Sequence, residues 1–249
     1  MGVELTRAHR SIQVVLFDLG GTLFYDDPDA WERIYARADK ALWDSLNASG
    51  VRASPEIVFG RDDGLLHYYY ELRATGLDEP GAAGVLRELL TRREIPFSEA
   101  SLTKALGAMY AVTQTNWHLE HDAIPALEKV RAAGIRQGII SNGSDDANAR
   151  RLLEKGDLES YFETVLTSAA FGRRKPDPSI FQAALAEFGV GPEESVMVGD
   201  SYEADIAGAR AVGMRTIWIT RRVRQLPGAP GLQAETKVGS LAEIPALVV

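Results

Sequence analysis

The sequence predicts an α/β fold, a doubly wound parallel sheet that carries an inserted α-helical domain. Three observations support this prediction. Residues 11–17 are mostly β-branched or apolar and a Gly-containing turn follows at 18–22, which indicates a buried strand and a loop. Residues 25–116 place apolar side chains at helical spacing, without strand-like alternation. From residue 123 onward helices and strands alternate, as in parallel strands joined by right-handed crossovers.

The inserted segment is predicted to be helical throughout. Its first helix begins near Pro28, which suits a first turn, and ends before Gly50, with apolar residues such as Trp31 and Leu42 at helical intervals. Further helices are expected around 57–74, 84–93 and 99–116. We therefore assign residues 25–116 to a helical insert, and residues 1–24 together with 117–249 to the core.

The core elements are read from the same alternation. Strands are expected at 136–140, 164–166, 195–198 and 216–219, and helices at 123–133, 147–154, 179–188 and 203–212. A loop rich in Pro and Gly at 225–233 and a short helix at 241–247 complete the predicted elements.

Composition excludes several classes of protein. The chain has 249 residues, of which 45% are hydrophobic and 25% charged, as in ordinary globular proteins. Its net charge of -8 argues against nucleic acid as the main partner. The absence of cysteine rules out disulfides and thiolate metal sites. Because we find neither a signal peptide nor an apolar run of roughly 20 residues, we expect a cytoplasmic protein with no membrane partner, as a monomer or homodimer.

Polar side chains gather where the predicted strands end. Ligands of parallel α/β sheets bind beyond the carboxyl ends of the strands, so these positions matter for function. The positions combine carboxylates, a hydroxyl, an amide and a lysine: Asp18 after the first strand, Ser141 and Asn142 after the second, Lys175 before the helix at 179, and Asp200 and Asp205 after the strand at 195–198.

Together these groups suit phosphoryl transfer. A carboxylate such as Asp18 can attack phosphorus and form an acyl phosphate, which divides one difficult step into two. Mg²⁺ prefers hard oxygen ligands and would let an anionic nucleophile approach an anionic phosphate. Taken singly, each residue has a structural explanation: Asp18 as a turn residue, Asp200 as a helix cap, and Lys175 as a solvated loop lysine. Their order and context together favour the functional interpretation.

The sequence resembles the haloacid dehalogenase-like (HAD) hydrolases over nearly its whole length. The resemblance rests on four motifs: Asp18-Leu19-Gly20-Gly21-Thr22-Leu23, Ser141, Lys175-Pro176-Asp177-Pro178, and Gly199-Asp200 with Asp205. It implies a Rossmann-like core, and the insert resembles the α-helical cap of the subgroup that includes small-metabolite phosphatases. We refer to the insert as the cap.

The resemblance also implies a role for each motif residue. Asp18 would be the nucleophile. The side chains of Asp18 and Asp200 would ligate Mg²⁺, together with the backbone carbonyl of Gly20. Asp205 would support this shell. The remaining groups would bind the phosphate of a small phosphorylated metabolite: Ser141, Asn142 and Lys175.

The sequence departs from the family pattern at Gly20. The family's phosphatases carry a second aspartate there, two residues after the nucleophile, as general acid and base. A 2-haloacid dehalogenase is one alternative, because a departing halide needs no proton. A non-catalytic phosphate-binding protein that has lost its acid/base group is another. A phosphonate hydrolase would need a cap lysine, for which Lys40 and Lys104 are available.

Several further residues near or within the cap are candidates for a functional role. Asp26 or Asp27 could replace the missing aspartate, although a position at a helix start by Pro28 is the stronger interpretation. A surface or capping role is favoured for His118 and His121. We expect at least two of three consecutive tyrosines to be packing residues rather than substrate ligands, within the group His67, Tyr68, Tyr69, Tyr70 and Arg73.

Overall fold

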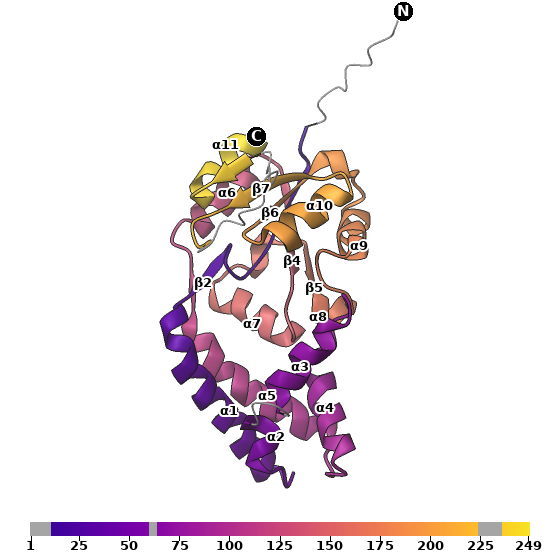
Figure 1. The fold of residues 1–249 in the computed structure, drawn as a ribbon. Coiled ribbons are helices and arrows are strands. Elements are labelled where there is room, and N and C mark those ends of the chain that lie inside the picture. The colour runs from indigo at the N-terminus through magenta and orange to yellow at the C-terminus, as the bar shows by residue number, and fades with distance from the viewer. Residues whose placement is uncertain (1–10, 60–63, 224–235) are drawn as a thin grey trace, which may run out of the picture.

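The core is built around a single parallel sheet. The computed structural model describes residues 11–59, 64–223 and 236–249. Within them six strands pair in the order β5-β4-β1-β6-β7-β8, all parallel (Figure 1). Their bounds are β1 Val14–Phe17, β4 Arg136–Ser141, β5 Thr164–Thr167, β6 Ser195–Gly199, β7 Arg215–Ile219 and β8 Thr236–Val238. The α/β fold class predicted from the sequence is confirmed.

Helices cover both faces of the sheet, which explains why β1 is apolar throughout. Successive strand side chains point to opposite faces. Val15 and Phe17 pack with α6 (Ala123–Ala132) and α11 (Pro245–Val248), whereas Val14 and Leu16 pack with α9 (Pro178–Phe188) and α10 (Gly208–Ala211). All four residues of β1 are fully buried. Asp18 therefore follows a strand whose position is fixed from two sides.

Some core elements differ from the prediction. The helix expected at 203–212 is a π-helical segment, Tyr202–Ala207, that continues into α10. The closing helix is a 3-10 turn at Leu241–Glu243 followed by α11, which has Pro245 in its first turn. The strand β8 and the helix α8 (Ser168–Phe171) were not predicted, because three or four residues carry too little periodicity. The loop expected at 225–233 lies outside the described residues.

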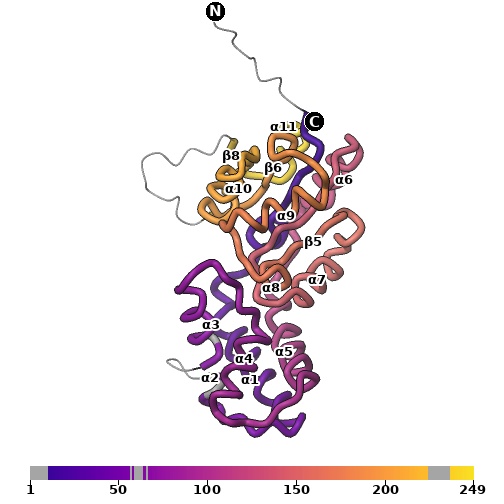
Figure 2. Tube along the Cα trace, turned by 90° about the vertical axis from the view of Figure 1, so that its right-hand side faces the viewer, coloured from indigo at the N-terminus to yellow at the C-terminus, as the bar shows by residue number. Residues whose placement is uncertain are grey.

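The cap consists of helices that lie beyond one edge of the sheet, where the strands end (Figures 1 and 2). The described helices are α1 Trp31–Ala48, α2 Pro55–Phe59, α3 Leu65–Ala74, α4 Ala82–Arg92 and α5 Glu99–Thr113. The stretch expected to be helical around 57–74 contains parts of two helices, α2 and α3, and Gly64 directly before α3 has an extended backbone. The helix expected at 99–116 ends at Thr113 and continues as a 3-10 turn, Gln114–Asn116.

The cap has an apolar core of its own. Leu42 and Leu46 lie four residues apart on α1 and pack with Leu102 and Leu106 of α5. The N-terminus of α5 is fixed by Ser98, whose hydroxyl accepts a hydrogen bond from Ser101 N in a reciprocal capping box. None of the described helices is both long and apolar enough to cross a membrane.

A two-stranded ribbon links the cap and the core. The strands β2 (Phe24–Asp26) and β3 (Trp117–Leu119) pair antiparallel where the chain enters the cap from the core and where it returns. Neither was predicted, because each has only three residues. Lys155 Nζ donates to the carbonyls of Trp117 and Gln114, at 2.7 Å in each case, and so ties β3 to the core helix α7 (Asp146–Lys155).

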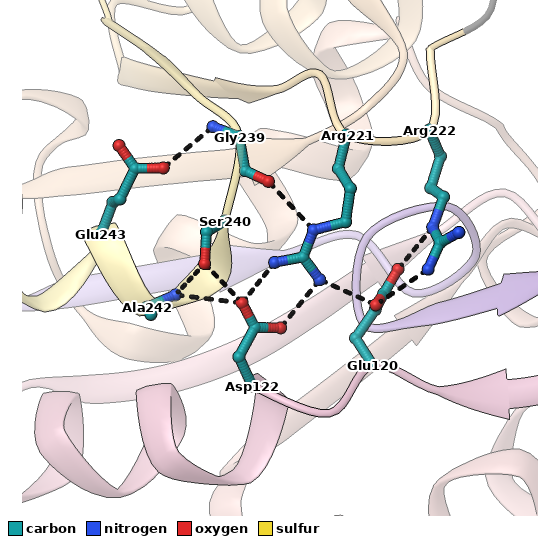
Figure 3. Close-up of polar contacts among 8 residues, drawn as sticks. All are labelled: Glu120, Asp122, Arg221, Arg222, Gly239, Ser240, Ala242 and Glu243. Carbon is teal, nitrogen blue, oxygen red and sulfur yellow. Dashed lines mark hydrogen bonds and ion pairs between the residues drawn. The ribbon is translucent and has the colours of Figure 1, made fainter.

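Two arginines hold the chain where it leaves β3 (Figure 3). Arg221 donates to both oxygens of Asp122 and to Glu120, and Arg222 donates to Glu120 at 2.8 Å. Burial favours the neutral form of Asp122, but the hydrogen bonds from Arg221 and Ser240 hold its pKa well below the usual range. These carboxylates therefore serve as anchors for the ribbon rather than as metal ligands.

Candidate active site

A buried carboxylate–lysine–carboxylate array lies at the carboxyl ends of the central strands. Asp18 directly follows β1, and its N–H donates to the Val198 carbonyl at 2.8 Å. Lys175 Nζ donates to Asp18 Oδ1 at 2.6 Å and lies 2.6 Å from Asp205 Oδ1. It also donates to the Ile140 carbonyl at 2.6 Å. The structure therefore brings together groups that are up to 187 residues apart in the sequence.

The charge of Lys175 is secured by its neighbours. Burial alone would lower the pKa of this ammonium, but the carboxylates of Asp18 and Asp205 outweigh burial and raise it above its usual value. Lys175 is 2% exposed and Asp205 is 1% exposed, so solvent screens these interactions little. The lysine is therefore a permanent positive charge beside Asp18.

Asp200 completes the array from the end of β6. Its pKa is raised to about 7, first by burial and then by the nearby carboxylates of Asp18 and Asp205. Burial likewise raises the pKa of Asp205 to about 6, against the opposing effect of Lys175. The approach of Asp200 depends on Gly21, which has φ +84°: a Cβ built there would lie 2.6 Å from Asp200 Cγ. Sequence reasoning did not assign this role to Gly21.

The donor set fits a divalent cation. One carboxylate oxygen from each of Asp18, Asp200 and Asp205 lies within 4.8 Å of the others. Three carboxylates beside one ammonium leave an excess of two negative charges when all are ionised. Hard oxygen ligands and this excess suit Mg²⁺. Asp205 receives hydrogen-bonding or ionic contacts at both oxygens, from Lys175 Nζ and Ser201 N, which favours a supporting position.

Asn142 clamps the backbone of Lys175. Its Nδ2 donates to the Lys175 carbonyl at 2.9 Å, and its Oδ1 accepts from the Lys175 N–H at 2.8 Å. Both ends of the amide are thus engaged, although Asn142 also lines the active-site cavity. Ser141 ends β4, lines the same cavity and is 7% exposed. The structure therefore shows a positioning contact for Asn142, where the family resemblance implied phosphate binding.

The site lines a cavity of about 370 Å³. We call four of its lining residues the polar floor: Asp18, Lys175, Asp200 and Asp205. Its other sides come from the turn after β4, from α7 and from the ribbon, through Ser144, Asp145, Asn148, Leu152 and Trp117. This volume suits a small molecule.

An indole occupies the space beside Gly20. A Cβ built at Gly20 would lie 3.0 Å from Cη2 and 3.3 Å from Cζ3 of Trp117. Trp31 and Trp117 pack edge to face with their ring centroids 5.9 Å apart, and Tyr35 stacks on Trp31 with the centroids 4.8 Å apart. We call Trp117, Trp31 and Tyr35 the aromatic wall. Sequence reasoning missed it; the only signal was the position of Trp117 directly after the expected end of the cap.

The two carboxylates suggested as substitutes for the missing aspartate have other partners. Asp26 accepts a hydrogen bond from the Trp31 indole and lines a different cavity, together with Arg221 and Arg222. Asp27 caps a 3-10 turn by accepting from Asp29 N at 3.0 Å. Neither lines the active-site cavity.

The cap contacts the loops that carry the site. Glu79, between α3 and α4, accepts from Tyr69 at 2.9 Å and from Ser168 at 3.1 Å. Ser168 Oγ in turn accepts from Gly143 N at 3.0 Å, in the turn after β4. Arg174 reaches from the Lys175 loop to the Asp78 carbonyl at 2.8 Å. The cap is therefore fastened to both loops that position Ser141 and Lys175.

Other cap residues singled out from the sequence do not line the cavity. Tyr68 and Tyr69 belong to the packed interior of the cap, in agreement with the expectation, while Tyr70 is 58% exposed. Lys40 is exposed and paired with Asp44 on α1, and Lys104 is exposed on α5. These lysines offer no buried amine for a Schiff base.

The fold and the site define a class, an α/β protein with a helical cap and a buried aspartate directly after its first strand. The chain belongs to the haloacid dehalogenase-like hydrolase family, whose model matches residues 12–213. This confirms the resemblance found in the sequence motifs.

Two relatives are named for phosphatase activities. The phosphoserine phosphatase of Thermus thermophilus is 30% identical over 247 residues, which cover 94% of this chain and 98% of that protein. The glyceraldehyde 3-phosphate phosphatase of Methanopyrus kandleri is 29% identical over 211 residues, 84% of each chain.

Solved structures share the fold. A 2-haloacid dehalogenase from Pseudomonas syringae matches with a TM-score of 0.68 at 24% identity, over 95% of this chain and 97% of that chain. A HAD-hydrolase from Bacillus subtilis, solved bound to magnesium, matches with a TM-score of 0.62 at 16% identity, over 96% and 99% of the two chains. At these identities the likeness shows the fold.

Proposed function

We propose that this chain is a magnesium-dependent phosphatase that hydrolyses small phosphorylated metabolites through an aspartyl phosphate on Asp18. The observation that carries the proposal is the Asp18 carboxylate on the floor of a cavity, held by the buried ammonium of Lys175 and neighboured by Asp200. Such a carboxylate is positioned to attack phosphorus. The phosphatase names of two relatives of similar length support the proposal.

Each residue has a proposed part. Lys175 orients Asp18 and offsets the charge of the phosphoryl group, and the hydroxyl of Ser141 binds a phosphoryl oxygen. Asn142 positions Lys175 through its backbone. Asp18, Asp200 and the Gly20 carbonyl would hold Mg²⁺, with Asp205 in support. When bound, the ion would neutralise the negative charge that otherwise opposes approach of Asp18 to phosphate.

A dehalogenase is the second candidate, favoured by the apolar indole beside Gly20, where a proton donor would otherwise stand. The three clustered carboxylates favour the phosphatase, because a halide-displacing site has no need for a metal-binding array. A phosphate-binding protein without catalysis is the third candidate, since Gly20 supplies no general acid or base.

A substrate panel separates these candidates. Phosphate release from a set of phosphorylated metabolites would be measured with Mg²⁺ and with a chelator, and halide release from 2-haloacids would be measured alongside. We expect phosphate release that requires Mg²⁺ and disappears in Asp18→Asn. The matched control is Asp44→Asn, because Asp44 is exposed and paired with Lys40 on the cap. Metal-independent halide release would replace the proposal with the dehalogenase. Phosphate binding without turnover would replace it with the binding protein.

A further inference from the structure

We propose that Trp117 determines specificity, by selecting aryl phosphate esters whose leaving group is planar and departs as a stable anion. This inference rests on the proposed phosphatase function and narrows its substrate class. It sets the chain apart from relatives whose names specify the alkyl phosphates phosphoserine and glyceraldehyde 3-phosphate.

The Trp117 ring restricts the side chains that position 20 can carry. A Cβ at Gly20 would approach the Trp117 ring to 3.0 Å, closer than side chains ordinarily pack. A side chain at position 20 therefore requires the Trp117 ring to shift by a few tenths of an ångström. In this chain an indole, and no carboxylate, lies at that position.

The Trp117 indole is held in place by contacts of its backbone and of its ring. The Trp117 carbonyl accepts from Lys155 Nζ at 2.7 Å, and its strand pairs with β2. Its indole meets the edge of Trp31, which hydrogen-bonds to Asp26 and stacks on Tyr35. A fixed ring is a pre-organised surface for binding a flat group.

The cavity has a polar end and an apolar end. The polar floor takes the phosphoryl group, whereas Trp117 lies on the wall next to Gly20 and shares the cavity with Leu152 and Ala149 of α7. An aromatic leaving group stacks favourably on an indole, while an alkyl chain with hydroxyl groups gains less.

The chemistry points to the same class. Asp18 oxygen forms a bond to phosphorus as the bond from phosphorus to the ester oxygen breaks, and that oxygen leaves with its electron pair. A phenolate carries this charge by delocalisation and takes its proton from water after release. An alkoxide is too basic to leave without a donor. Water then attacks the aspartyl phosphate, the Asp18–phosphorus bond breaks, and the proton of water passes to the phosphate product or to solvent.

One remaining carboxylate among the described cavity residues needs a test of its own. Asp145 lines the cavity, but its Oδ1 accepts from Asn148 N at 2.7 Å as the N-cap of α7. If Asp145 supplied a proton to the leaving group, alkyl esters would be good substrates and Asp145→Asn would abolish that advantage.

The experiment compares kcat/KM for aryl and alkyl phosphates across a range of leaving-group pKa, with saturating Mg²⁺. The ratio kcat/KM reports the first transfer, which differs between esters, whereas hydrolysis of the aspartyl phosphate is common to all. We expect aryl esters to exceed alkyl esters by about 10²-fold or more. Equal values for the two classes in the wild type would overturn the inference while leaving the phosphatase intact. Turnover of neither class, with no phosphorylated Asp18, would overturn the proposed function itself.

Variants then test Trp117 directly. Trp117→Leu should raise KM for aryl esters by about threefold to tenfold, from lost stacking, and change alkyl esters little. Tyr70→Leu is the control, because Tyr70 is exposed on α3 and does not line the cavity. Gly20→Asp combined with Trp117→Ala should raise kcat/KM for alkyl esters by about 10²-fold over Trp117→Ala alone. An unchanged aryl KM in a folded Trp117→Leu would contradict the role of the indole.

Discussion

The polar floor and Trp117 of the aromatic wall line the same cavity but arise in different ways. The floor is built by the core, where parallel topology places the ends of β1 and β6 side by side and so brings Asp18 and Asp200 together, while the loop before α9 adds Lys175. The wall comes from the ribbon and α1, at the junction between core and cap. In the function proposed above, the floor carries the phosphoryl-transfer chemistry and Trp117 carries the preference for aryl esters. The two proposals therefore assign chemistry and specificity to separate parts of the structure.

The largest expected effect comes from breaking the floor. In Lys175→Met, Asp18 and Asp205 lose their shared partner while remaining buried, which should lower the free energy of unfolding by about 3–5 kcal/mol. Phosphate release should fall by about 10³-fold or more, because the nucleophile loses its orientation. Urea unfolding and steady-state kinetics measure the two effects. A variant that keeps wild-type activity would remove Lys175 from the mechanism.

A second prediction concerns the effect of pH on the floor. The raised pKa values of Asp200, about 7, and Asp205, about 6, mean that the folded protein holds these protons more tightly than the unfolded chain. Their contribution to stability is present below about pH 4 and is lost as the pH rises to about 7. Metal-free protein should therefore melt at lower temperature at pH 8 than at pH 5.

Mg²⁺ should show the opposite dependence, because it binds the charged carboxylates. Its affinity should increase by up to about tenfold per pH unit for each proton displaced, up to about pH 7, and level off above. Calorimetric titration at several pH values measures this. A Mg²⁺ affinity that is constant between pH 5 and 8 would mean that these carboxylates do not bind the ion.

The floor was largely predictable and the wall was not. Asp18, Lys175 and Asp200 lie at strand ends or beside a helix start, so periodicity and parallel topology were enough to expect them at one edge. Trp117 stands in a strand of three residues, and its contact with Gly20 depends on how the ribbon folds back. No local pattern encodes that contact. The clamp formed by Asn142 likewise depends on tertiary packing.

A third prediction tests the anchor of the ribbon against an ordinary surface pair. Arg221→Met removes the hydrogen bonds that Asp122 and Glu120 accept from Arg221 in a partly buried site. This loss should lower the free energy of unfolding by about 1–3 kcal/mol. Lys40→Met removes an exposed pair with Asp44 and should cost at most about 0.5 kcal/mol. Thermal unfolding of the two variants provides the comparison. Equal losses would show that the network in Figure 3 does not stabilise the ribbon.

The smallest expected effect belongs to the clamp on Lys175. Asn142→Ala removes two hydrogen bonds to the Lys175 backbone. The Lys175 ammonium should keep its charge but be positioned less precisely beside Asp18. We expect kcat to fall by about tenfold and KM to change little, because positioning matters most in the transition state. A large rise in KM instead would indicate that Asn142 binds the phosphate directly.

The central claim is that Asp18 becomes phosphorylated during turnover. The most direct measurement is a rapid acid quench of the Mg²⁺-loaded protein during turnover of an aryl phosphate labelled on phosphorus, followed by peptide mapping. The account predicts a label on the peptide that contains Asp18, formed faster than steady-state turnover, and no label in Asp18→Asn. Because Gly20 supplies no base for the second step, the labelled protein should accumulate. Turnover without any label on Asp18, under conditions that preserve acyl phosphates, would contradict the account.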